Sequence, residues 1–192
     1  MGSFGTVIPV TGLNNGFLGH ISRLGKRTVK SRQLLATTTS NLAFGGAAVI
    51  VPDATGGTYQ PVADFIAGGG SASNMAKQFA GVAVREIKTN LQYGVNVGIN
   101  TQTVNYYQPG EIAEVLEEGS VVVQINYGTP QSQGAVYVRT VFNASIPNGA
   151  VGGFEAQSDG TNNTLIPGVV WTTGVVDSNN CAEITILNRL AA

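Results

Sequence analysis

The chain has very few of the residues on which many kinds of functional site depend. Its 192 residues include one cysteine, Cys181, one histidine, His20, and one tryptophan. A single cysteine excludes an internal disulfide and a cysteine-based metal cluster, and a single histidine excludes most zinc sites and nearly all catalytic triads. We therefore expect no metal and no cofactor.

Charge is scarce as well. Asp, Glu, Lys and Arg make up 11% of the residues, against about 25% in an ordinary soluble domain. A polar but weakly charged surface favours association, because few ions must lose their water when a partner covers them. No apolar run approaches the about 18 residues of a membrane helix. The opening sequence MGSFGTVIPVTG does not resemble a signal peptide, so we expect no membrane partner.

The charges that are present are unevenly distributed. No acidic residue precedes Asp53, and the first fifty residues carry a net charge of +5 against −6 for the remainder. This asymmetry is typical of a basic arm attached to a mildly acidic body. The cations of the arm are Arg23, Lys26, Arg27, Lys30 and Arg32.

The hydrophobic pattern predicts strands almost throughout the chain. Short apolar runs are separated by turn sequences such as SDGTNNT and DSNN, and helical periodicity is confined to Ser73–Ala80, with Ser73 as its cap. We therefore predict an all-β fold, an antiparallel β-sandwich or barrel of jelly-roll type over residues 47–192, preceded by an extended arm over residues 1–46. The predicted strands lie at 48–51, 81–87, 91–100, 120–127, 136–141, 169–172 and 182–187.

An acidic group is the best candidate for catalysis. Glu111, Glu114, Glu117 and Glu118 lie within eight positions, and a glycosidase needs two such carboxylates across a cleft. However, the sequence EIAEVLEEGSVVV also predicts a β-hairpin whose tight turn contains Glu117 and Glu118. Carboxylates at an exposed hairpin tip keep ordinary pKa values, so we favour the hairpin and expect its tip to contact a partner.

The two remaining reactive side chains have simpler interpretations. His20 lies in the glycine-rich sequence FLGHISRLG, where an arm residue that packs on a neighbour is the favoured interpretation. Cys181 precedes the apolar run AEITIL, so we expect a small core residue and not a nucleophile.

The basic run RLGKRTVKSR leaves three alternatives open. It could be a solvated flexible arm, a phosphate-binding segment for nucleic acid, or an arm docked along an acidic protein surface. No aromatic residues are interleaved with the cations, as single-stranded nucleic-acid binding would favour, so nucleic acid is the weakest alternative. The acidic body of the chain favours docking.

Four segments resemble the structural cement, or capsid-decoration, proteins of tailed bacteriophages. They are LAFGGAAVIVPDATGGTY, GVAVREIK, YQPGEIAEVLEEGSVVV and AEITILNRL. The resemblance implies a β-rich protein, without catalytic residues, that binds the outer surface of the phage capsid and bridges neighbouring major capsid proteins. The matched positions with a structural role are Phe44, Gly45, Tyr107, Pro109, Gly110 and Gly119.

On this hypothesis the arm contacts the capsid or sister subunits. We expect its five cations to dock electrostatically, with Phe17, Leu18 and Ile21 as apolar anchors and Glu117 and Glu118 as hairpin-tip contacts. Self-association as a dimer or a trimer fits a β body equally well. The alternative is a tail or fibre adhesin that binds carbohydrate through an exposed aromatic platform. Its candidate residues are Tyr106, Tyr107 and Trp171.

Overall fold

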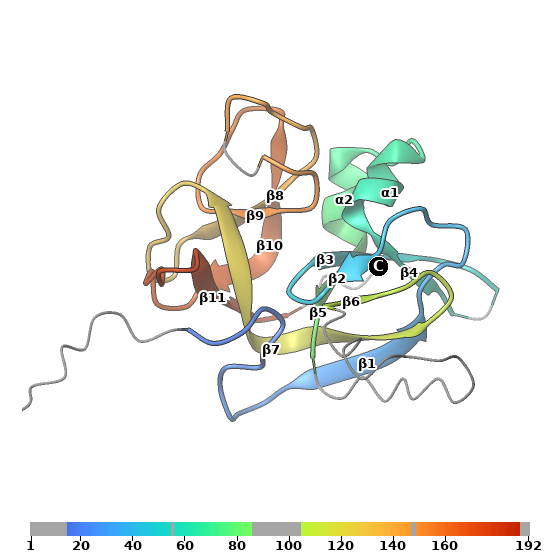
Figure 1. The fold of residues 1–192 in the computed structure, drawn as a ribbon, viewed down its shortest axis with the longest axis horizontal. Helices are drawn as coiled ribbons and strands as arrows, with labels where there is room; N and C mark the ends of the chain where they lie inside the picture. Colours follow the sequence, from blue (N-terminus) through green and yellow to red (C-terminus); the bar gives the residue numbers. More distant parts are fainter. Residues whose placement is uncertain (1–14, 55, 86–104, 147–148, 189–192) are drawn as a thin grey trace, which may run out of the picture.

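The protein is built from eleven β-strands and two short helices in the part described by a computed structural model, residues 15–54, 56–85, 105–146 and 149–188 (Figure 1). This confirms the all-β prediction. The strands are β1 (Thr28–Gln33), β2 (Leu42–Ala43), β3 (Ala47–Val51), β4 (Thr58–Pro61), β5 (Phe79–Ala83), β6 (Tyr106–Tyr107), β7 (Ile112–Tyr127), β8 (Ala135–Arg139), β9 (Phe154–Glu155), β10 (Asn163–Trp171) and β11 (Cys181–Ile186). The helices are α1 (Val62–Ala67) and α2 (Ala72–Gln78).

Strand β7 organises the whole fold. Its first half pairs with β1 and β5, and its second half pairs with β11 and β9. The strand bends between the two halves, so it runs along one part of the molecule and then turns into the other (Figure 1). Gly119 lies at this point with φ of 125°, a conformation that glycine adopts without strain.

The predicted hairpin at Glu117 and Glu118 is therefore wrong. These residues lie inside one continuous 16-residue strand, and Glu117 is buried. The physical reason is that pairing strands are available on both sides of the bend. Strand β1 pairs with β7 up to Glu118, and β11 takes over from Gly119, so every residue around the bend finds a neighbouring strand without a reversal of the chain.

The second half of β7 belongs to a closed barrel. The ring of pairings runs through β7, β9, β8, β10 and β11 and returns to β7, and the β7–β9 pair is parallel whereas the others are antiparallel. Its interior is apolar, as the alternation in the predicted strands indicates. Fully buried side chains of this core include Val121, Val136, Trp171 and Ile184.

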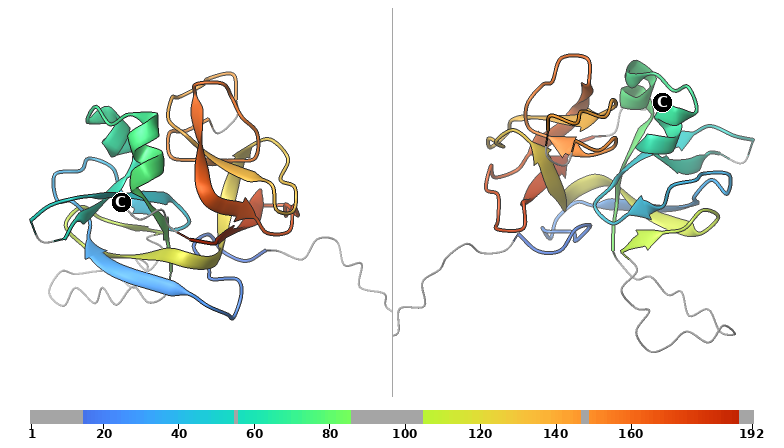
Figure 2. Two further views of the ribbon diagram at one scale, coloured as in Figure 1. Left: turned by 180° about the vertical axis from the view of Figure 1, so that it is seen from behind. Right: turned by 45° about the horizontal axis from the view of Figure 1, so that its top comes forward.

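A second layer packs beside the barrel. Strands β3, β4 and β5 continue the sheet from β7, and α1 and α2 lie together over it (Figure 2). The prediction of a helix near Ser73–Ala80 is confirmed by α2, although the cap is Ser71, whose hydroxyl accepts a hydrogen bond from the Asn74 backbone. The helix α1 was not predicted, because six residues are too few to show a period.

The described part of the predicted arm pairs with the large sheet through β1 and forms, with β6, a separate two-stranded sheet through β2. Residues 28–33 form β1 and residues 42–43 pair with β6, while Leu34 and Phe44 are buried in a second apolar cluster. Phe44 meets Tyr107 edge to face with ring centroids 5.2 Å apart. The division at residue 46 stays a prediction, and the predicted strand at 91–100 lies outside the described residues.

Candidate functional site

The N-terminal segment runs along β7 before it reaches β1. The Gly19 amide donates to the Val122 carbonyl (2.9 Å), and the Ser22 amide donates to the Ser120 carbonyl (3.1 Å). Ile21, one of the predicted anchors, is half-buried against the barrel core. Residues 23–27 then form a loop between this pairing and β1. The candidate contact residues are thus placed by backbone hydrogen bonds.

Arg23 binds a buried carboxylate on β11. Its Nε and Nη2 donate to the two carboxylate oxygens of Glu183, both at 2.8 Å, and the Ser22 hydroxyl donates to the same carboxylate. The Glu183 side chain is 7% exposed and that of Arg23 is 55% exposed. Although burial opposes it, the hydrogen bonds from Arg23 and Ser22 and the charge of Arg23 lower the pKa of Glu183.

Two lysines bind the carboxylates that were expected at the hairpin tip. Lys26 Nζ lies 2.8 Å from Glu118 Oε1, and Lys30 Nζ lies 2.9 Å from Glu117 Oε2. The acidic surface that the basic run was expected to meet is therefore on its own chain. The opposite charges of the two parts of the sequence predicted such ion pairs. They did not show whether the carboxylates would belong to the same chain or to a neighbouring copy.

The two remaining cations of the run, Arg27 and Arg32, lie close to glycines. Arg32 Nη1 donates to the carbonyl of Gly56 (2.7 Å) beyond β3. Arg27 passes so close to Gly119 that a Cβ at residue 119 would lie 3.3 Å from the Arg27 Cβ. A role of these cations in capsid contact stays a prediction, as it does for Glu117 and Glu118.

The start of the described chain is anchored by a residue that the sequence did not single out. The Asn15 amide donates to Asp177 Oδ2 (2.9 Å), and its side-chain amide donates to the Cys181 carbonyl (2.7 Å). Asp177 also accepts the amides of Asn179 and Cys181. Burial opposes the effect, but these amide donors lower the pKa of Asp177. Beside this anchor Phe17 is 76% exposed and Leu18 is half-buried.

Three of the four residues of the acidic group have partners within the chain. Glu117 and Glu118 are bound to lysines, and Glu111 accepts the Gln108 amide at the start of β7. Among the residues that the structure describes, no three His, Cys, Asp or Glu side chains are grouped to hold a metal ion. Cys181 is buried, and burial, with the nearby charge of Asp177, raises the pKa of its thiol. A raised pKa leaves little reactive thiolate.

The aromatic platform of the adhesin alternative is contradicted by burial. Trp171 is fully buried in the barrel, and Tyr107 is buried with its hydroxyl donating to the Val84 carbonyl (2.8 Å). Of the three candidate aromatics, only Tyr106 reaches the surface in part. A sugar-stacking surface made of these residues is therefore excluded, because the apolar rings fill the core.

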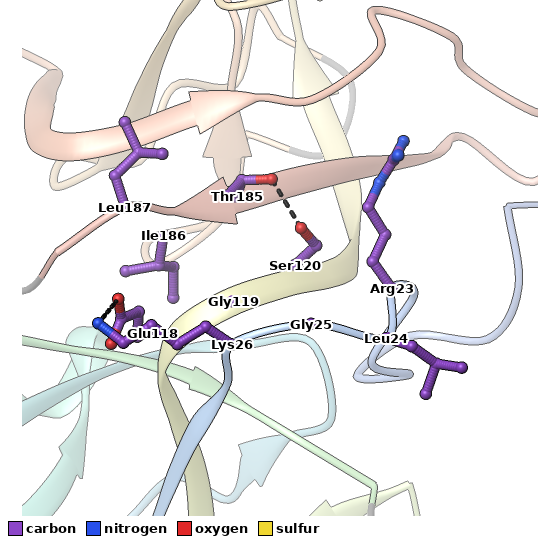
Figure 3. Close-up of a pocket in the computed structure, with 10 residues that line it drawn as sticks. All are labelled: Arg23, Leu24, Gly25, Lys26, Glu118, Gly119, Ser120, Thr185, Ile186 and Leu187. Atoms are coloured by element: carbon purple, nitrogen blue, oxygen red, sulfur yellow. Dashed lines mark hydrogen bonds and ion pairs between the residues drawn. The ribbon is translucent and has the colours of Figure 1, made fainter.

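Large apolar side chains are exposed elsewhere, and sequence reasoning identified only Phe17 among them. Those in the described residues are Phe17, Leu24, Ile112, Val141, Phe142, Leu165, Val175, Val176 and Leu187. Two of them, Leu24 and Leu187, line a groove of about 290 Å³ between the 23–26 loop and the end of β11 (Figure 3). No periodic pattern marks these positions, because several of them lie in loops.

A comparison with models of known protein families shows to which family the chain belongs. The family model described as structural cement protein (E217 gp24/Pam3 gp6) matches residues 8–187. The chain belongs to the structural cement protein family. The family resemblance inferred from the four sequence segments is thus confirmed, and this cement protein has a structural role in the phage virion, on the capsid.

A solved structure supports the fold of the cement protein independently. A chain of the structure entitled "The capsid of Myoviridae Phage XM1" is similar with a TM-score of 0.58 and 15% sequence identity, over 96% of each chain. No curated protein sequence matches the chain. Within the described ranges, neither helix has the length and apolar character needed to cross a membrane.

Proposed function

We propose that this protein binds the outer surface of a phage capsid and bridges neighbouring major capsid proteins, so that it stabilises the head without catalysis. The observation that carries the proposal is the match of the structural cement family to residues 8–187. The protein chain of the phage XM1 capsid structure shares the fold over nearly its whole length.

The distribution of exposed apolar side chains supports a bridging role. A bridge needs at least two separate contact surfaces, and each needs apolar groups that gain from burial. Phe17 and Val175 belong to segments that Asn15 ties together, since its side chain donates to the Val175 carbonyl (3.0 Å). Phe142 is exposed just beyond the end of β8, a strand of the barrel. Ile112 is exposed at the first residue of β7, in the half of that strand that lies outside the barrel.

Three of the basic side chains are already bound to carboxylates of their own chain, which favours capsid contacts that do not depend on ion pairs. Arg23, Lys26 and Lys30 have carboxylate partners within the chain. If these cations bound capsid carboxylates instead, one ion pair would replace another, with little net gain in binding free energy. Binding by apolar and neutral polar groups at many lattice positions fits the low charge of the chain, because repeated modest contacts raise the effective concentration at each next site.

The test uses capsids assembled without the protein. We expect the purified chain to co-sediment with them at a copy number comparable to that of the capsid subunit, and to raise the temperature at which the capsids rupture. Phe17→Ser, which changes an exposed side chain and leaves the core intact, should weaken co-sedimentation by about tenfold or more if Phe17 is an anchor.

Deletion of the whole basic segment is not a suitable test, because it would remove β1 from the sheet. Two outcomes would count against the proposal. An absence of co-sedimentation would contradict capsid binding, and binding without any change in rupture temperature would contradict bridging.

A further inference from the structure

The residue that anchors the start of the described chain, Asn15, is followed by a glycine. An asparagine before glycine is chemically labile in an unfolded chain, because glycine has no side chain to shield its amide nitrogen. The Gly16 nitrogen attacks Asn15 Cγ, and its proton leaves with the side-chain nitrogen as ammonia while a succinimide ring forms. Water then opens the ring to aspartate or isoaspartate. The net change is hydrolysis of one amide to a carboxylate and ammonia.

The fold needs both residues of this labile pair. Asn15 Nδ2 donates to the carbonyls of Val175 (3.0 Å) and Cys181 (2.7 Å), so position 15 requires a side chain with two hydrogens to donate. Gly16 has φ of 113°, a conformation that side chains with a Cβ rarely adopt. A Cβ at residue 16 would also lie 3.3 Å from His20 Nδ1. The anchor therefore depends on the same two residues that make it reactive.

The folded barrel opposes the reaction. Both hydrogen bonds of Asn15 Nδ2 must be broken before that nitrogen can leave as ammonia. The backbone amide of Asn15 is held as well, because it donates to Asp177 Oδ2 (2.9 Å). Conversion thus requires local opening of the anchor, and its rate in the folded protein is the rate in the open chain multiplied by the fraction of time that the anchor is open.

Conversion would remove the anchor permanently. A carboxylate at residue 15 has no hydrogen to donate, so its oxygen would face the carbonyl oxygens of Val175 and Cys181. It would also add a second negative charge beside Asp177, which accepts the Asn15 amide. Isoaspartate would in addition lengthen the backbone by one carbon. Each product therefore opposes closure of the anchor.

We propose that Asn15 and Gly16 form a site of spontaneous deamidation that the folded barrel suppresses, and that conversion of Asn15 releases the segment with Phe17 and Leu18 from the barrel. The substrate is the side-chain amide of the protein itself, and the co-reactant is water. The change runs in one direction, because ammonia is lost. This inference goes beyond the proposed function and does not rest on it, since it concerns the free chain.

The first test measures how well the fold protects the site. The full chain is incubated in mildly alkaline buffer with and without urea, and peptide mass spectrometry follows the conversion of each asparagine. In urea, Asn15 and Asn148 should convert at similar rates, because both precede glycine. Without urea, conversion of Asn15 should be slower by at least about tenfold. Fragment spectra distinguish Asn15 from Asn14, which does not precede glycine.

The second test measures the release of the segment. Asn15→Asp has the side chain of one product, and hydrogen exchange reports which amides it exposes. The Gly19 amide, which donates to the Val122 carbonyl, and the His20 amide should exchange faster than in the wild type by about tenfold or more. The Arg139 amide at the end of β8 donates to the Gly153 carbonyl and should keep its wild-type rate, because the barrel stays folded.

Asn179→Asp is the matched control. It makes the same change of side chain in the loop that contains Asp177, but Asn179 is exposed and only its backbone amide binds Asp177. Exchange at Gly19 should therefore be nearly unchanged in N179D. If N179D accelerates exchange as much as N15D does, added charge and not the lost anchor is the cause, and the inference is wrong.

Three further results would overturn the inference. They are equal conversion of Asn15 in the folded and the denatured chain, wild-type exchange of the Gly19 amide in N15D, and loss of protection at Arg139 in N15D, which would show unfolding of the barrel instead of local release. None of these measurements involves capsids. The inference can therefore fail while the proposed function holds, and the reverse is also possible.

Discussion

Arg23 and Glu183, which are 160 residues apart in the sequence, share two hydrogen bonds of 2.8 Å between the guanidinium and the carboxylate. This pair joins the basic N-terminal segment to the last strand of the barrel. It shows that the opposite charges of the two parts of the chain are used for internal assembly.

Loss of the Arg23–Glu183 pair should destabilise the protein more than loss of the nearby Lys26–Glu118 pair. Arg23→Ala leaves the buried Glu183 without its partner and should lower the free energy of unfolding by about 1–2 kcal/mol, a value reduced for the exposure of Arg23. Lys26→Ala removes a partner that is 81% exposed and should cost about 0.5 kcal/mol or less. Urea unfolding of both variants tests the difference. Equal losses would show that the burial of Glu183 has no energetic consequence.

Acid should destabilise the fold through its buried carboxylates. The pKa values of Asp64, Asp177 and Glu183 are lowered in the folded protein. Their stabilisation is therefore present above the unfolded pKa, about 4, and is lost as the pH falls through the folded values. We expect a melting temperature that is nearly constant around neutral pH and decreases below about pH 4.

The variant Asp177→Asn separates this effect from general acid unfolding. It removes a carboxylate that accepts three backbone amides, from Asn15, Asn179 and Cys181. D177N should melt at a lower temperature than the wild type at neutral pH, and the difference should shrink in acid, because the wild-type carboxylate is then protonated. A difference that does not change with pH would contradict the assigned role.

A buried ion pair should be the most sensitive point of the barrel. Arg139 and Glu155 are both fully buried and are bound to each other. Arg139→Met leaves the buried Glu155 carboxylate without its cation and should cost about 3–5 kcal/mol, whereas the double change Arg139→Met with Glu155→Leu should restore part of that loss. Denaturant unfolding of the single and double variants measures the difference. A double variant no more stable than the single one would argue against charge burial as the cause.

Two glycines should differ strongly in their response to alanine. A Cβ on Gly81, where φ is +143°, would overlap the Leu116 carbonyl oxygen of the neighbouring strand. Gly81→Ala should therefore cost about 3 kcal/mol or more. Gly25→Ala should change the melting temperature little, because nothing lies within 4 Å of the added carbon. Comparable melting of G81A and wild type would rule out the close approach at β5.

Much of the fold was predictable because it depends on local signals. The strands β3, β8 and β11 follow from apolar runs bounded by turn residues, and α2 follows from a capped amphipathic pattern. The bend of β7 was not predictable. Glu117, Glu118 and Gly119 have the composition of a turn, but β1 and β11 supply pairing partners on both sides of the bend.

The candidate site was predictable in its composition but not in its connections. The basic run and the acidic group were identified from the sequence, and so was their tendency to meet. The pairs of Lys26 with Glu118 and of Lys30 with Glu117 join residues about ninety positions apart. Charge in a sequence indicates the sign of a partner but not its chain, since Coulomb attraction depends on separation in space and not on separation along the chain.

The sequence alone determined the all-β class and indicated the family, because these depend on residue types and local periodicity. Only the tertiary structure decided that Trp171 lies inside the barrel, that the cations of the N-terminal segment bind their own chain, and that Leu24 projects beside an open groove. Burial and exposure result from which distant strands pair. A local sequence pattern does not contain that information.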